Sequence, residues 1–240
     1  MSNKLVNVEW NVASNVKILV TKKNFLSKKN FNLSYISDKH PVIKKNREDL
    51  NKLFPSTPHY MKQVHGNKVI NLDNEISSSH ICDGLITKRK NQVIGVLTAD
   101  CIPLVIASKC GNIICVLHVG RKGLEYNIIK NAFKILNTYN YKYEVWVGPA
   151  ISKKYYIVDI KIRNLFKNIN KNYEKFFTKN NSNNNYNMDL IGIASFQLTQ
   201  NNVANIFYSN LCTVENNDDF YSYRYSSDKE RFGTYVWINS

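Results

Sequence analysis

The apolar residues of this 240-residue chain fall in short runs, and none approaches the ~20 consecutive residues that a membrane-spanning helix needs. Such runs, bounded by polar residues, predict buried or half-buried β-strands. The predicted strands are residues 16–20, 93–97, 104–107, 113–117, 144–147 and 235–238. Because 43% of the residues are hydrophobic, the chain can build a core without disulfide support, and wholesale disorder is excluded.

Four segments between these runs carry apolar residues at helical spacing and predict α-helices. They are residues 43–54, 124–136, 162–169 and 190–198, with Pro55 closing the first and Asp189 capping the last. Strands and helices mix without the strict alternation of a doubly wound sheet, so the sequence favours an α+β fold. No repeat and no linker divides the chain, so we expect a single domain, residues 1–240, with the polar tract 179–187 as a surface loop.

The formal net charge of +15 at pH 7 raises the question of a nucleic-acid partner. The charge comes mostly from lysines scattered along the chain, and asparagine is similarly abundant. Because Lys and Asn share A-rich codons, genome composition explains both, and we expect a solvated basic exterior without a nucleic-acid partner. An N-terminus without an export signal and five irregularly spaced cysteines favour a cytoplasmic protein with reduced thiols, and a monomer is the default expectation.

Residues of catalytic type interrupt apolar strands between residues 65 and 149, each beside a glycine or proline. Gly66 follows His65, Pro103 lies two residues after Cys101, and a glycine-containing turn follows His118. Strand ends on a rigid sheet hold side chains in fixed positions, so these three side chains are candidate ligands of one metal. Imidazole and thiolate donors favour zinc, and three protein ligands leave a fourth position for water or substrate.

The same residue types leave other sites open. Two imidazoles and a thiolate also bind copper, usually with an axial methionine, for which Met61 is the candidate. A multicopper oxidase needs more histidines in His-x-His pairs, and the five present (His40, His59, His65, His80 and His118) form no such pair. Without a metal, Cys101 with His65 or His118 is a thiolate–imidazolium nucleophile for a cysteine hydrolase. A hydrogen-bonded structural histidine is the remaining alternative.

Several segments, taken together in chain order, are distinctive: Asn46-Arg47, QVHGNKV, DGLITKRKNQVIGVLTADCIPLVI, CVLHVGRKGL, VGPAISKKYYIV and LCTVENNDDFYSYR. They resemble the YfiH or laccase-domain family, whose members were first called multicopper polyphenol oxidases. Members of that family are regarded as purine nucleoside phosphorylases with adenosine deaminase activity. The resemblance covers about residues 21–237 and implies a four-layer α/β/β/α fold with mixed sheets. It also implies that His65, Cys101 and His118 are zinc ligands.

The resemblance implies that the substrates are inorganic phosphate and a purine nucleoside: adenosine, inosine, guanosine or methylthioadenosine. The products are the free base and ribose-1-phosphate. Phosphate recognition requires cations, so Arg47, Lys22 and Lys122 are candidate phosphate ligands by charge and by position within the family segments. Asn46, beside Arg47, and Gln63 are further candidates for substrate binding.

Adenosine deamination requires a carboxylate that moves a proton, and Asp100, beside Cys101, is nearest in the sequence. Adjacent strand residues point to opposite faces, so Asp100 acts on substrate only if the chain turns there. Otherwise we expect it to bond to backbone or to a ligand histidine.

The chain departs from the family pattern at several positions. Arg121 and Lys122 stand where the family has Trp-Arg, and Lys22 lies in a segment that has lost paired glycines. Ile157 replaces a glutamate, and Glu230 replaces the glycine before Arg231. Because lysine does not reproduce the bidentate contact of arginine, an eroded, slow family member remains an alternative.

Overall fold

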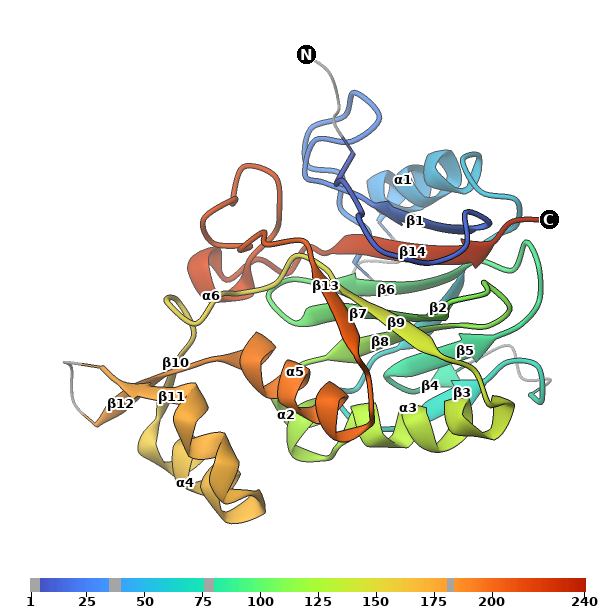
Figure 1. The fold of residues 1–240 in the computed structure, drawn as a ribbon. Helices are drawn as coiled ribbons and strands as arrows, with labels where there is room; N and C mark the ends of the chain where they lie inside the picture. Colours follow the sequence, from blue (N-terminus) through green and yellow to red (C-terminus); the bar gives the residue numbers. More distant parts are fainter. Residues whose placement is uncertain (1–4, 35–39, 76–79, 181–183) are drawn as a thin grey trace.

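The computed structural model describes residues 5–34, 40–75, 80–180 and 184–240 (Figure 1). Its strands are β1 (Val16–Val20), β2 (His59–Lys62), β3 (Val69–Asn71), β4 (His80–Ile81), β5 (Gly84–Thr87), β6 (Ile94–Thr98), β7 (Ile102–Ser108), β8 (Ile114–Val119), β9 (Tyr143–Val147), β10 (Ile157–Asp159), β11 (Phe177–Lys179), β12 (Asn185–Met188), β13 (Asn205–Tyr208) and β14 (Phe232–Ile238). Its α-helices are α1 (Pro41–Asn51), α2 (Arg121–Glu125), α3 (Ile128–Leu136), α4 (Ile160–Ile169), α5 (Leu190–Gln200) and α6 (Tyr223–Ser226).

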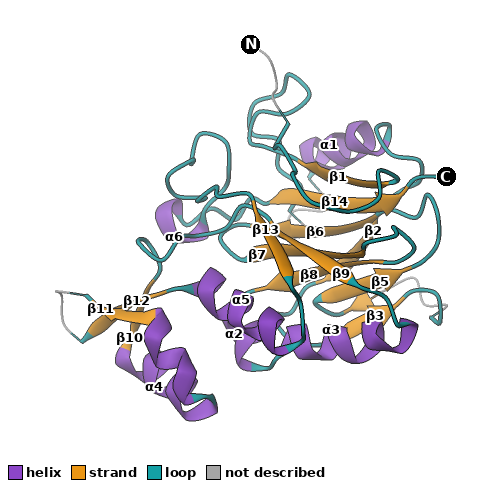
Figure 2. Cartoon of the chain, in the orientation of Figure 1, coloured by secondary structure: helices purple, strands orange, loops and turns teal. Residues whose placement is uncertain are grey.

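Two mixed sheets form the centre of the described chain (Figure 2). The first has the strand order β1-β14-β6-β2-β4, antiparallel as far as β6 and parallel from β6 to β4. The second has the order β13-β9-β7-β8-β5-β3, with parallel pairs only at its two edges. A smaller antiparallel sheet, β10-β12-β11, lies to one side with α4 (Figure 1).

The period-two alternation of the strands sorts the apolar side chains into three cores. Between the two large sheets, Val96 and Val236 of the first pack with Val116 and Trp146 of the second. The outer face of the second sheet packs on α2, α3 and α5, where Phe133 is buried. The other outer core gathers Leu50 of α1 and Leu97 and Tyr235 of the first sheet. The result is the expected four-layer α/β/β/α arrangement of an α+β fold.

The six predicted strands are present as β1, β6, β7, β8, β9 and β14. The remaining strands were not predicted, because segments of two to four residues with mixed polarity carry no recognisable alternation. The tract 179–187 was predicted as a loop, but its ends pair as β11 and β12; residues 181–183 lie outside the described residues.

Helices are present in all four predicted segments, but the second prediction was wrong in its continuity. Residues 124–136 are divided between α2 and α3, because Asn127 adopts a left-handed φ of 57° between them. The predicted cap of α5 is confirmed, since the Asp189 carboxylate accepts a hydrogen bond from Gly192 N at 2.7 Å. None of the helices among the described residues combines the length and apolar content that a membrane crossing requires.

We predict that Asp189→Ala lowers the free energy of unfolding by about 1 kcal/mol, since it removes the side-chain acceptor at the start of α5. Denaturant titration of the variant beside the parent protein measures this change. Asp189→Asn is the matched control and stays within a few tenths of a kcal/mol of the parent, because asparagine is an equally good cap. An alanine variant as stable as the asparagine variant would contradict the prediction.

Candidate metal centre

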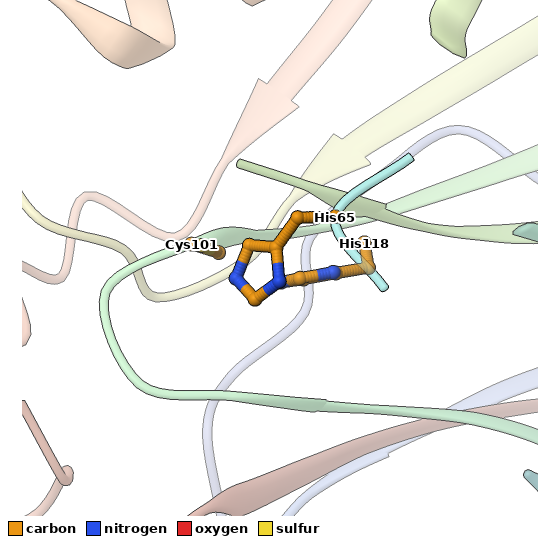
Figure 3. A group of neighbouring side chains, drawn as sticks. All are labelled: His65, Cys101 and His118. Atoms are coloured by element: carbon orange, nitrogen blue, oxygen red, sulfur yellow. The ribbon is translucent and has the colours of Figure 1, made fainter. Parts of the chain in front are cut away.

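The three predicted ligands lie where the chain passes from one large sheet to the other, or at a strand end close to that place. His65 lies in the connection from β2 of the first sheet to β3 of the second. Cys101 ends the connection from β6 to β7, which also crosses between the sheets, and His118 lies near the end of β8. Their ligand atoms all lie within 4.8 Å of one another, and Figure 3 shows the side chains converging. The predicted juxtaposition is therefore confirmed.

Asp83, immediately before β5, holds two of the three ligands in place. Its carboxylate accepts hydrogen bonds from the backbone N–H groups of Val64, His65 and Gly66, at 3.2, 3.0 and 2.7 Å. One of its oxygens also lies 2.8 Å from His118 Nδ1, and its carbonyl accepts from His118 N at 2.8 Å. Because Nδ1 is engaged by Asp83, Nε2 of His118 is the nitrogen left for the centre.

Close backbone approach completes the packing around the sulfur. A Cβ at Gly120 would lie 2.8 Å from Cys101 Sγ, so only glycine fits there without a shift. The rings of His65 and His118 meet edge to face, with centroids 4.6 Å apart. His65 adopts a left-handed φ of 59°, a turn that the three hydrogen bonds to Asp83 support. The donors therefore sit in a preformed arrangement.

The charges of the centre favour a thiolate. Burial alone would raise the pKa of the Cys101 thiol, but the charge of His118 and hydrogen bonds from His118 and His65 lower it. Burial would likewise lower the pKa of His118, but the Cys101 charge and the hydrogen bond to Asp83 raise it. In contrast, burial raises the pKa of the Cys82 thiol to about 12. Cys101 is thus prepared to act as a thiolate, which is the form that binds metals.

The donor set fits a metal ion. Two imidazoles and a thiolate, one of the imidazoles oriented by a carboxylate, form a typical three-ligand site for a borderline-soft metal such as zinc. No other group of three His, Cys, Asp or Glu side chains within the described ranges is arranged in this way. The arrangement can hold one ion and present it to a ligand from the cavity beside it.

A cavity of about 830 Å³ opens beside the three donors. The side chains that line it include two cations and no carboxylate among the described residues. They are Ser34, Thr57, Pro58, His59, Tyr60, Met61, Lys62, Gln63, His65, His80, Leu97, Thr98, Ala99, Cys101, His118 and Arg231. A volume in this range holds a drug-sized molecule, and the absence of acidic lining favours an anionic or neutral one.

Two predicted site residues lie beside the centre with their polar groups engaged. The Gln63 amide donates to Leu97 O at 2.8 Å and accepts from Leu97 N at 3.0 Å, which fixes the chain that leads to His65. The chain does turn at Asp100, where φ is 84°. Its carboxylate accepts hydrogen bonds from Thr213 Oγ1 and from the backbone N–H of Arg224, both at 2.7 Å. The second bond is the contact with backbone that we expected as the alternative to a role in proton transfer.

The predicted phosphate ligands are not among the lining residues of the cavity. Lys22 forms an ion pair with Asp219 at 2.8 Å, and Lys122 is exposed on α2. Asn46 and Arg47, on α1, donate to the carbonyls of Asn32 and Leu33. They therefore support the chain segment that carries Ser34 to the cavity wall.

The positions that depart from the family pattern also lie outside the lining. They are Lys22, Arg121, Lys122, Ile157 and Glu230. Arg121 pairs with Glu125 on its own helix at 3.1 Å, and Ile157 is 38% exposed at the start of β10. None of these five side chains therefore forms part of the described cavity wall.

Sequence reasoning missed three residues of this region: Asp83, Ser34 and Arg231. Asp83 begins the segment DGLITKRK, and its position directly before an apolar strand is the signal that could have found it. Ser34 and Arg231 line the cavity from opposite ends of the chain, and no local pattern connects them.

Known proteins are similar to this chain in sequence and in fold. The family described as multi-copper polyphenol oxidoreductase laccase matches residues 17–239. A purine nucleoside phosphorylase of Haemophilus influenzae is 28% identical over 97% of this chain and 98% of its own length. A purine nucleoside phosphorylase of Rickettsia prowazekii is 33% identical over 74% of this chain and 78% of its own length.

Solved structures show the same architecture. The crystal structure of a Neisseria meningitidis protein superposes with a TM-score of 0.87 at 23% identity, over 98% of this chain and 99% of that one. A Bacillus licheniformis protein named YfiH superposes with a TM-score of 0.82 at 20% identity, over 93% of each chain. At these identities the likeness concerns the fold alone.

We predict that Asp83→Asn weakens metal binding by roughly 10- to 100-fold, the usual cost of losing a carboxylate that orients a ligand histidine. The amide would also present an NH2 group to N–H donors around it. Competition with a chromogenic chelator measures the affinity. Asp73→Asn, at another carboxylate that accepts backbone and side-chain bonds, is the control and retains the parent affinity. Equal affinities of the two variants would contradict the role given to Asp83.

We predict that iodoacetamide modifies Cys101 of metal-stripped protein at neutral pH before it modifies Cys82. A lowered pKa keeps the reactive thiolate present as the pH falls below 9, whereas the raised pKa of Cys82 keeps that thiol protonated. Peptide mass spectrometry over pH 5–9 locates the label. Added zinc protects Cys101; a Cys101 that stays unmodified until alkaline pH without metal would refute the electrostatic account.

Proposed function

The chain belongs to the multi-copper polyphenol oxidoreductase laccase family, the YfiH type, and we propose that it acts as a purine nucleoside phosphorylase with zinc at the His65–Cys101–His118 centre. The observation that carries the proposal is that these donors border a cavity of about 830 Å³ whose described lining includes two cations, Lys62 and Arg231, and no carboxylate. Relatives named purine nucleoside phosphorylase over nearly the whole chain support the reaction class.

The proposed reaction joins phosphate to the ribose. An oxygen of inorganic phosphate forms a bond to the anomeric carbon of the nucleoside while the bond from that carbon to the purine nitrogen breaks. The electron pair of the broken bond stays on the purine, which takes up a proton, and the products are free base and ribose-1-phosphate. The cations at the cavity wall suit this reaction because phosphate enters as an anion and the base leaves with negative charge.

The two imidazoles and the thiolate support zinc as the resident ion. When bound, zinc supplies Lewis acidity and lowers the pKa of a water ligand. The chain itself would orient His118 through Asp83 and hold Cys101 as a thiolate. The described centre has two imidazole donors, which suffice for one ion. This favours a zinc phosphorylase over a copper polyphenol oxidase, which needs several copper ions and more histidines.

Adenosine deamination is the proposed second activity, in which water adds to the purine C6 and ammonia leaves. The same donor set supports it, because zinc deaminases use imidazole and thiolate ligands of this kind. Asp100 stays a candidate for proton transfer, and its hydrogen bonds to Thr213 and Arg224 would have to yield for that role. Adenosine, inosine, guanosine and methylthioadenosine are the substrates we propose to test.

A metal-free cysteine hydrolase is the rival function, and the lowered pKa of Cys101 beside His118 favours it specifically. The two functions differ in metal dependence and in product. The hydrolase would act on an amide without phosphate and would lose activity when Cys101 is alkylated. The phosphorylase requires phosphate, and a bound metal shields Cys101 from alkylation.

We predict that purified protein of measured metal content converts inosine and phosphate to hypoxanthine and ribose-1-phosphate, and that Cys101→Ser lowers the rate by roughly 100-fold or more. The loss should exceed the 10- to 100-fold cost of removing an outer orienting group, because Cys101 is itself a ligand. Chromatography of the products measures the rate. Cys110→Ser, at the exposed cysteine outside the centre, is the matched control and retains full activity.

Release of base without phosphate, or equal rates in the two serine variants, would contradict the proposal. Amide hydrolysis by metal-free protein would support the rival function instead. Oxidation of phenols that depends on bound copper would support the oxidase.

A further inference from the structure

We infer that Arg231 binds the phosphate group of the reaction, in an oxyanion site beside the metal centre. The inference rests on the proposed function for its role in turnover, but the site itself is argued from contacts and charge. Arg231 lies in the loop before β14 and lines the same cavity as Cys101 and His118. The ligand class is a tetrahedral oxyanion, either free phosphate or the phosphate ester of a nucleotide.

The guanidinium of Arg231 is held firmly at one nitrogen. Its Nη1 donates to the carbonyl oxygens of Asp228 and Glu230, at 2.9 and 2.7 Å. Among the described residues, Nε and Nη2 donate no hydrogen bond, so two nitrogens of the planar fork, with three N–H groups, remain for a ligand. A fork fixed at one end is pre-organised for bidentate contact with an oxyanion.

Arg231 is a half-buried cation without a carboxylate partner among the described side chains. Asp228 accepts a hydrogen bond from Ser222 N at 3.0 Å and lies 3.7 Å from Lys23 Nζ, and the adjacent Glu230 contacts the guanidinium through its backbone carbonyl. Burial lowers the pKa of the Arg231 guanidinium, with the negative charges of Cys101 and Asp100 opposing that shift. A desolvated, unpaired cation is costly, and an anion bound in the cavity would offset that cost.

The backbone of Arg231 is fixed by a frame from the opposite end of the chain. Asn32 Oδ1 accepts from both Arg231 N, at 3.0 Å, and Ser34 N, at 2.8 Å. Leu33 N donates to Arg231 O at 3.1 Å, and Arg47 donates to Leu33 O at 2.7 Å. The frame places Ser34 and Arg231 together on the wall, and it gives Arg47 a supporting role at this site.

The other candidate cations are less well placed for phosphate. Lys22 is neutralised by Asp219, and Lys122 lies on the exposed face of α2, outside the cavity lining. Lys62 does line the cavity, but it is exposed and offers a point charge instead of a fork. Arg231 is therefore the described lining residue that combines burial, charge and two available donors.

The test measures phosphate binding and turnover separately in Arg231→Gln and Arg231→Lys. We expect Arg231→Gln to weaken the binding of inorganic phosphate, and to raise its KM, by roughly 10- to 100-fold, as for loss of a charged hydrogen bond. The KM for inosine stays within threefold, and bound metal is unchanged. Arg231→Lys recovers part of the loss. Arg89→Gln, at an exposed arginine paired with Asp73, is the matched control and binds phosphate as the parent does.

Calorimetry with inorganic phosphate and with inosine 5′-monophosphate separates the two sources of the oxyanion. Dependence of phosphate binding on Arg231 assigns the free ion, and dependence of nucleotide binding alone assigns the ester. Phosphate binding that depends on Arg231 in a protein without phosphorolysis would refute the proposed function and leave the site standing. Phosphorolysis with an unchanged phosphate KM in both Arg231 variants would refute the role of Arg231 in turnover. Binding of both ligands unaffected by Arg231→Gln would overturn the site itself.

Discussion

The Asp83 carboxylate is the interaction on which the site depends. It is fully buried and accepts hydrogen bonds from backbone N–H groups of the turn that carries His65. One of its oxygens also forms a hydrogen bond with Nδ1 of His118. Two candidate ligands, one in a connection between the sheets and one in β8, are thereby fixed by one charged group. A buried carboxylate is costly unless its oxygens are hydrogen-bonded, and here four donors satisfy them. The hydrogen bonds that stabilise the buried Asp83 carboxylate are therefore the same bonds that fix the positions of His65 and His118.

The layered architecture explains why the site forms at this place. Two connections, those containing His65 and Cys101, pass from one large sheet to the other, and β8 delivers His118 to the same region. The inter-sheet core, including Val116 and Trp146, holds the sheets rigidly. The cavity beside the donors carries Lys62 and Arg231 without a described carboxylate, so the fold places a candidate metal site next to a wall that attracts anions.

The sequence was informative where a residue type is rare or a pattern is long. Glycine and proline beside two histidines and a cysteine indicated three side chains that the structure brings together, and Asp189 indicated the start of α5. Short strands such as β3 escaped prediction because pairing with a buried neighbour, β5, stabilises them more than their own residues do. Arg231 was not predicted because its place on the cavity wall depends on a hydrogen bond to Asn32, 199 positions earlier in the chain. The lack of an ion pair between Arg231 and a described carboxylate is likewise visible only in the structure. Lys22 and Lys122 were predicted from their charge and their position in the family segments. Neither criterion indicates that Lys22 pairs with Asp219 or that Lys122 is exposed to solvent.

X-ray absorption spectroscopy of the purified protein tests the central claim most directly, because it reports the atoms bound to the metal. The account predicts one zinc per chain with two nitrogen ligands at ~2.0–2.1 Å and one sulfur ligand at ~2.3 Å. Cys101→Ser should remove the sulfur from the spectrum. A metal surrounded only by oxygen and nitrogen, or a fully active protein without metal, would contradict the account.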